Sequence, residues 1–125
     1  MAIQLLALSV VAPWGQAIAE GRKRIEVRSW RPEVLPVRNL LIVENQRRLT
    51  ETGDTDPDGR AVALVDVMEV HPWAPDEAEA ACSTWEPGWW AWALENVRPI
   101  TTPFPMLAAR KLYMVEVDRR PTHAG

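Results

Sequence analysis

Residues 21–31, GRKRIEVRSWR, gather five cations around a single carboxylate in a chain whose net charge is −3. Four side chains that could bind a polar ligand alternate with other residues here, so a strand would place them on one face: Arg24, Glu26, Arg28 and Trp30. Two flanking guanidinium groups favour the ionised carboxylate. That carboxylate could accept hydrogen bonds from a nucleobase amino group or act as a base toward water. A solvent-facing edge strand with a ladder of ion pairs is the alternative interpretation.

Lys23 supplies a second group for acid–base chemistry. Glu26 could take a proton from water while Lys23 stabilises an oxyanion, although an ordinary surface lysine is the alternative. The two residues are three apart, and a regular strand would point them to opposite faces. They converge only if Lys23 still belongs to the turn after Gly21. Arg28 suits a planar partner with two oxygens, either a phosphate on a ligand or the carboxylate of Glu95 in a structural ion pair.

Tryptophan is the other informative residue type, with seven copies against one Tyr and one Phe. Trp14 and Trp30 could stack on a base, although core packing is the commoner role of a tryptophan. The three tryptophans of residues 89–92 (WWAW) cannot all point inward in a strand, so at least one should be exposed or cover a cleft. Ser29 and Asn96 are candidate hydrogen-bonding partners for a base edge.

Charge is unevenly distributed along the chain. Residues 1–48 carry eight Lys/Arg and four Glu, a balance of +4, whereas residues 49–125 carry six cations and thirteen acids, a balance of −7. A basic face on an acidic protein can still attract phosphate, because the local field acts on the ligand. The acidic excess lies in residues 51–86, which could form a face for a basic protein partner. Solvated surface is the plainer interpretation of both clusters.

No cofactor or metal is expected. There is one cysteine, the two histidines lie far apart, and no glycine-rich phosphate loop is present. The apolar N-terminal stretch lacks a preceding cation and is interrupted by Pro13, so neither a signal peptide nor a membrane span is expected. The expected location is the cytoplasm.

The elements that would position these residues are mainly strands. Strands are predicted over residues 3–10, 24–30, 37–44, 60–70 and 111–118, while 89–97 fits a strand or a helix. A helix should begin at Pro13 and end at Gly21, and a short acidic helix should cover 74–82. Residues 50–59 and 101–105 are predicted loops. Five or six strands with two helices predict an α+β domain or a small, partly open barrel.

Two stretches resemble the ASCH domain family, part of the larger PUA-like group. The family typically has a strand, a Pro-Trp helix, a Gly-x-Lys turn and an Ile-Glu-x-Arg-Ser-Trp strand. The same order stands here in Pro13–Trp14, Gly21–Lys23 and Ile25–Trp30, and WALENVRPI over residues 92–100 looks like the family's second signature. The resemblance implies one domain over residues 1–125: a small PUA-like β-barrel of five to six strands, a Pro-Trp helix after the first strand and a second short helix. Residues 119–125 would be a flexible tail.

The resemblance also implies functions. The family is generally regarded as RNA-binding, and some relatives are metal-independent hydrolases, either amidohydrolases on N4-acylated cytidine or ribonucleases. The amidohydrolases use a lysine after the Gly-x turn, a threonine three residues on and a distal glutamate. Lys23 matches the lysine, but Glu26 occupies the threonine position. The distal glutamate could be Glu77, Glu79 or Glu86.

Three hypotheses follow. The first is binding of single-stranded RNA or a modified nucleoside in a basic, tryptophan-lined cleft. The second is hydrolysis in the same cleft, with Lys23 and Glu26 as the candidate catalytic residues. The third is a protein-interaction domain that uses the acidic residues 51–86. Ligand contacts are expected from Trp14, Arg24, Arg28, Ser29, Trp30, Glu95 and Asn96; the base that is read and the oligomeric state are not predicted.

Overall fold

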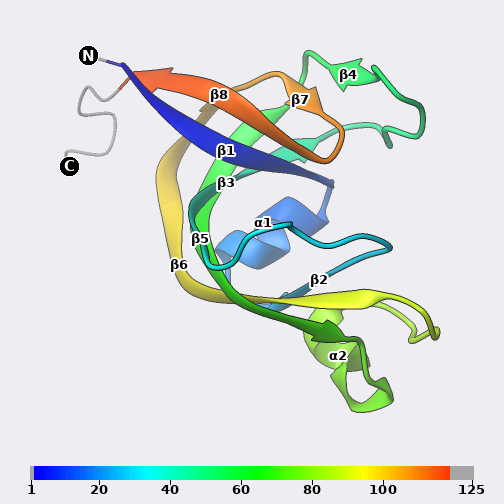
Figure 1. Ribbon diagram of the computed structural model, residues 1–125. Helices are drawn as coiled ribbons and strands as arrows, with labels where there is room; N and C mark the ends of the chain where they lie inside the picture. Colours follow the sequence, from blue (N-terminus) through cyan, green and yellow to red (C-terminus); the bar gives the residue numbers. More distant parts are fainter. Residues whose placement is uncertain (1, 119–125) are drawn as a thin grey trace.

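The computed structural model describes residues 2–118. Six strands form one sheet in the order β2-β6-β5-β3-β1-β8, in which β1 and β3 are parallel and all other neighbours are antiparallel. The sheet curls into a half-barrel around helix α1 (Figure 1). Its strands are β1 (Ala2–Val11), β2 (Ile25–Arg28), β3 (Val37–Asn45), β5 (Arg60–Pro72), β6 (Trp90–Pro105) and β8 (Leu112–Asp118).

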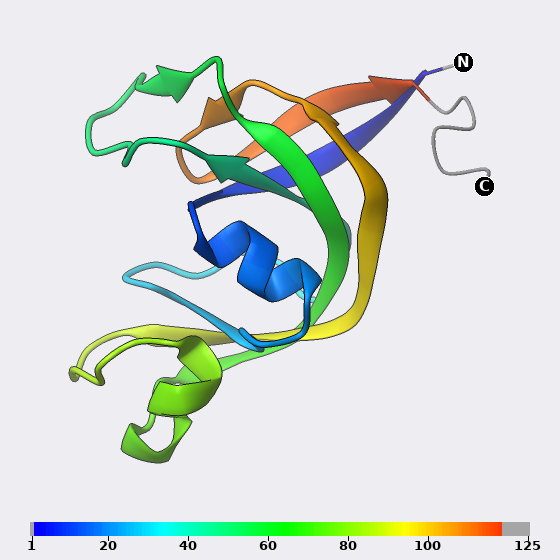
Figure 2. The same cartoon turned by 180° about the vertical axis from the view of Figure 1, so that it is seen from behind.

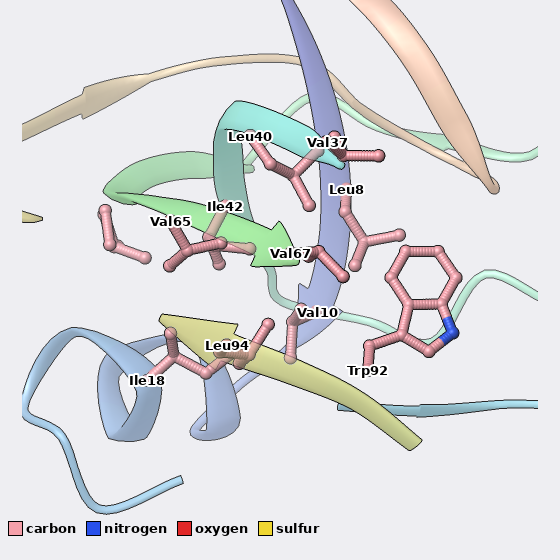
Figure 3. Close-up of a cluster of buried hydrophobic side chains, with 12 residues drawn as sticks. Leu8, Val10, Ile18, Val37, Leu40, Ile42, Val65, Val67, Trp92 and Leu94 are labelled. Carbon is pink, nitrogen blue, oxygen red and sulfur yellow. The ribbon is translucent and has the colours of Figure 1, made fainter. Parts of the chain in front are cut away.

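The main core fills the concave side of the sheet. Side chains from four strands meet Ile18 of α1 (Trp14–Ala19) there, as Figure 3 shows. Alternation along β5 sends Val65 and Val67 into this cluster, and Trp92 closes it with a fully buried indole. The apolar periodicity of the sequence therefore sets which face of each strand is inside.

Helix α1 packs very closely on the end of β3. A Cβ atom added at Gly15 would lie 2.7 Å from the Cβ atom of Glu44, so only glycine fits at this crossing. The Glu44 carboxylate accepts a hydrogen bond from the Gln16 backbone N–H at 2.7 Å. The Pro-Trp-Gly sequence thus fixes the helix against the strand, and with it the place of Trp14.

Two excursions leave the half-barrel at opposite ends (Figure 2). One is a two-stranded sheet of β4 (Thr55–Asp56) and β7 (Ala108–Ala109). The other is the 3-10 turn η1 (Pro75–Glu77) followed by α2 (Ala78–Ala81). These excursions become the walls of the site described below.

The structure corrects two of the expected loops and decides one ambiguity. Residues 50–59 include β4, and residues 101–105 continue strand β6 in spite of two prolines. The prolines are tolerated because β6 is long and its pairing with β5 has register shifts there. Residues 90–97 are strand. The tail expected at 119–125 lies outside the described residues. No helix among the described residues is long and apolar enough to cross a membrane.

Candidate functional site

An open cleft of about 540 Å³ lies between the two excursions. One wall comes from β2, the end of α2 and the segment after it; the other comes from the end of β3, the loop after it and the turn between β7 and β8. Trp14, at the start of α1, also lines the cleft. The site is therefore assembled from segments distant in sequence.

A row of buried charges lies along one wall of this cleft. The Lys23 Nζ atom donates to the Ala81 carbonyl at 2.5 Å and lies 3.4 Å from Oε1 of Glu26. Both Nε and Nη2 of Arg28 lie 2.7 Å from Oε2 of the same glutamate. The Arg28 Nη2 atom also donates to the Ser9 carbonyl at 2.6 Å. One carboxylate is thus held between two cations, and each cation is anchored to a backbone oxygen.

The chain between α1 and β2 allows this row to form. Strand β2 begins at Ile25, so Lys23 belongs to the turn after Gly21, whose φ is +81°. Because Lys23 lies outside the strand, its side chain reaches the same side as Glu26. The sequence required Lys23 to belong to the turn for the two residues to converge, and the structure meets that requirement. Lys23 and Glu26 are only 7% and 6% exposed. Such deep burial of both charges is unusual for surface lysines and glutamates.

The cleft is positively charged in an acidic protein. Its lining includes five Lys/Arg side chains and two carboxylates, a local balance of +3 against −3 for the whole chain. The cations are Lys23, Arg28, Arg48, Arg110 and Lys111, and the carboxylates are Glu26 and Glu86. An anionic ligand would be drawn to this cleft because the local field outweighs the distant acids.

Tryptophans line the same space. Trp14, Trp30, Trp73 and Trp89 all contribute to the cleft. Trp30 packs edge-on against the buried Trp92 at 5.0 Å between ring centroids, which holds its ring in place. Trp89 is 37% exposed and is the member of the WWAW group at the cleft, in agreement with the expectation that one would be.

Four of the predicted ligand-contact residues lie elsewhere. Arg24 and Ser29 are exposed and outside the cleft. Strand β2 runs only from Ile25 to Arg28, so Arg24 lies before it and Ser29 after it. Glu95 and Asn96 are exposed on β6, away from the lining. The proposed pair between Arg28 and Glu95 is wrong, since Arg28 binds Glu26 instead.

The second sequence signature has a structural role. Asp66 on β5 is buried and accepts hydrogen bonds from the Asn39 backbone N–H, the Asn96 amide and the Arg98 guanidinium. Asn39 and Asn96 both have positive φ, at sites where the strand pairing is irregular. The Asn39 N–H, followed by the Asn96 amide, lowers the pKa of Asp66 despite its burial. The network secures the bends of β3 and β6.

Sequence reasoning missed several residues of the cleft. Ser9, Asn45, Arg48, Arg110 and Lys111 line it, yet none belongs to a motif. Asn45 is 3% exposed, and its amide oxygen has no hydrogen-bond donor among the described residues. The adjacent cations Arg47–Arg48 and Arg110–Lys111 were the available signals, and they do not specify a partner.

The three candidates for a distal glutamate differ in whether they line the cleft. Glu86 lines the cleft, whereas Glu79 does not. Glu77 accepts hydrogen bonds from His71 at 2.7 Å and from the Ala74 backbone N–H at 3.0 Å. Its contact with His71 raises the pKa of that imidazole. The pair of His71 and Glu77 stabilises the segment of η1 and α2, and the Ala81 carbonyl of that segment accepts the hydrogen bond from Lys23.

Comparison with known proteins places the chain in a family. Residues 8–104 match the ASCH domain, most of the 125 residues. The chain belongs to the ASCH domain family. Its curled six-stranded sheet with a helix after the first strand is an α+β fold, as predicted.

Two solved structures are similar to this ASCH domain. Both are crystal structures of mutant ZmASCH proteins from Zymomonas mobilis. The first has a TM-score of 0.48 and 16% identity, covering 81% of this chain and 72% of that chain. The second has a TM-score of 0.46 and 15% identity, with 81% and 73% covered. No curated protein matches the chain significantly.

Proposed function

We propose that this ASCH domain binds a nucleoside, or one nucleotide of single-stranded RNA, with its base in the cleft. The observation that carries the proposal is the buried row of Lys23, Glu26 and Arg28 along one wall. Burying an ion triad costs desolvation energy, and such groups contribute little net stability. Binding of a polar ligand that completes the hydrogen bonds of these three residues accounts for the burial of their charges.

The row retains hydrogen-bonding capacity for a base edge. Each carboxylate oxygen has two lone pairs, so Glu26 can accept from an amino group while it holds its two cations. Arg28 uses Nε and Nη2 within the protein, and its Nη1 has no acceptor among residues 2–118. A donor and an acceptor therefore lie side by side, which is the pattern that a nucleobase edge requires.

Aromatic rings supply the second half of base recognition. Trp14, Trp30 and Trp89 line the cleft, and a stacked base gains about 1–3 kcal/mol on such a ring. Stacking needs an unpaired base, so single strands and free nucleosides fit the cleft and duplexes do not. The acidic remainder of the chain also disfavours a long phosphate track.

A binding titration with a matched control tests the proposal. Tryptophan fluorescence would be followed as ribonucleosides and short single-stranded RNAs are added to the wild-type protein, Arg28→Ala and Arg24→Ala. Both variants lose one arginine of the same segment, but only Arg28 lines the cleft. We expect Arg28→Ala to weaken binding by about tenfold or more, and Arg24→Ala to bind as the wild type does. Equal affinities in all three proteins would refute the proposal that the ligand binds in the cleft.

Hydrolysis in the same cleft is the second candidate function. It is favoured by the 3.4 Å contact between Lys23 Nζ and Glu26 Oε1 and by Glu86 on the same cleft. Glu26 would take a proton from water as the water oxygen attacks the acyl carbon, and Lys23 would stabilise the oxyanion of the tetrahedral intermediate. As the intermediate collapses, the bond between the acyl carbon and N4 breaks, Glu26 returns the proton to N4, and the products are cytidine and a carboxylic acid. Incubation with N4-acylated cytidines and short RNAs, read by chromatography, tests this. Turnover that both Glu26→Gln and Lys23→Ala abolish supports a hydrolase, whereas binding without turnover leaves a reader of nucleosides.

A further inference from the structure

A second set of cations lines the wall opposite the buried row. Arg48 follows β3, and Arg110 and Lys111 form the turn between β7 and β8. We call these three residues the cationic rim. Unlike Lys23 and Arg28, neither Arg48 nor Arg110 has a carboxylate within ion-pair distance among residues 2–118. Their charge is therefore available to a ligand.

The two segments that carry the rim are fastened to each other. The small sheet joins them, because Thr55 pairs with Ala109 and Asp56 pairs with Ala108. The Ala109 backbone N–H also donates to the Ser9 hydroxyl at 3.1 Å. This hydrogen bond ties the segment that carries Arg110 and Lys111 to β1.

The loop before Arg48 is ordered by a buried acid. Asp56 is 2% exposed, and its carboxylate accepts hydrogen bonds from the backbone N–H groups of Asp58, Gln46 and Arg47. The Asp58 N–H contributes most to lowering the pKa of Asp56, which stays ionised at neutral pH. The Asn45 amide donates to the Arg47 carbonyl in the same loop. Arg48 therefore extends from a fixed backbone, so less ordering entropy is lost when it binds.

Lys111 connects the rim to the aromatic part of the cleft. Its φ is +59°, a left-handed conformation that a residue with a side chain adopts at a cost. Its Nζ atom lies 5.6 Å from the centre of the Trp30 ring. The strained turn therefore places a cation over one face of the Trp30 ring, so the aromatic surface of the cleft and a cation of the rim lie together.

We propose that the cationic rim is a phosphate-binding subsite, so that the cleft prefers phosphorylated nucleotides or an RNA phosphodiester to free nucleosides. The inference rests on the proposed function and adds to it the class of ligand. The buried row reads the base, and the rim holds the phosphate on the opposite wall. The rim is built from two joined loops and carries three cations, none of which has a carboxylate within ion-pair distance among residues 2–118.

The test compares matched ligands on matched variants. Isothermal titration would measure the binding of four sets of ligands: the four ribonucleosides, their 5′-monophosphates, their 3′-monophosphates, and trinucleotides without terminal phosphates. The proteins are the wild type, the rim variant Arg48→Ala/Arg110→Ala/Lys111→Ala and the control Arg22→Ala/Arg24→Ala/Arg38→Ala. Both variants lose three cations, but those of the control lie outside the cleft. Thermal unfolding would confirm that each protein is folded.

We expect wild type and control to bind a phosphorylated ligand about tenfold more tightly than its nucleoside, because each exposed cation adds a modest electrostatic gain. The rim variant should lose this preference, so that its affinity for a phosphorylated ligand falls to its affinity for the matching nucleoside. A gain for monophosphates points to a mononucleotide, and a gain for trinucleotides alone points to RNA backbone.

Two outcomes overturn the inference in distinguishable ways. If nucleosides bind and phosphates add nothing, or if the rim variant keeps the preference, the subsite is refuted while the base-binding cleft stands. If no nucleoside, monophosphate or trinucleotide binds the wild type, the proposed function fails and the subsite fails with it.

Discussion

At the scale of single residues, the buried charge row behaves differently from the surface ion pairs of the same protein. Arg22 lies 2.7 Å from Glu20 on the surface, with both side chains about half exposed, at 58% and 46%. Arg28 lies at the same distance from Glu26, whose side chain is only 8% exposed. Water can replace the first contact but not the second, so the two pairs should differ strongly in what their disruption costs.

We expect Glu26→Gln to lower the free energy of unfolding by about 3 kcal/mol, because it leaves two cations without their shared anion inside the protein. Urea unfolding followed by circular dichroism would measure the change. Glu20→Gln is the control, since it also removes one carboxylate paired with an arginine, and it should leave the urea midpoint unchanged. A Glu26→Gln protein as stable as the control would show that water enters the row freely.

At the scale of elements, the placement of α1 decides the shape of the cleft. The helix is six residues long and cannot hold itself together in isolation. Its packing on β3 at Gly15 and its buried Ala17 and Ile18 fix it inside the half-barrel. Because Trp14 is the first residue of this helix, the aromatic surface of the cleft depends on that packing.

Gly15→Ala tests this dependence. Alanine favours helix by about 1 kcal/mol over glycine, but its methyl group would lie 2.7 Å from the Glu44 side chain and 3.1 Å from its carboxylate. Overpacking of this kind costs about 1–3 kcal/mol, so we expect net destabilisation of about 1 kcal/mol and a lowered melting temperature. Gln16→Ala, next along the exposed side of the helix, should not destabilise. A Gly15→Ala protein that melts higher would mean that Glu44 moves aside without cost.

At the scale of the whole molecule, charge is separated in space as well as in sequence. The cleft carries a balance of +3, while the chain as a whole carries −3. Two of the ten acidic residues of 51–86 are buried: Asp56 and Asp66 accept hydrogen bonds in the network of loop and strand bends. Part of the charge of this stretch therefore serves the fold.

This charge separation predicts a specific salt dependence. For a short single-stranded RNA, the logarithm of the binding constant should fall with the logarithm of salt concentration with a slope of about −2, as about three phosphate contacts imply. Titrations by fluorescence anisotropy at several salt concentrations would measure it. A duplex of the same sequence should bind more weakly at every concentration. A slope near zero, or tighter duplex binding, would contradict a cleft that takes a single strand.

The sequence by itself determined the fold class, the order of most elements and the chemistry of β2. Alternation acts locally, so residues 21–31 place Glu26 and Arg28 on one face without a structure. The same alternation does not place Lys23 with them, and the structure shows that the turn after Gly21 does. The same local reasoning failed at residues 101–105, where pairing with β5 outweighs the prolines.

Only the tertiary structure decided which residues line the cleft. The Ala81 carbonyl that holds Lys23 is 58 residues away in sequence, and the cationic rim stands opposite the row because β4 pairs with β7. Contacts of this range depend on loop closure and packing, which leave no periodic trace in the sequence. The same limit explains why Asn96 and Glu95, within a recognisable motif, lie outside the cleft, while Arg48 and Arg110, within none, line it.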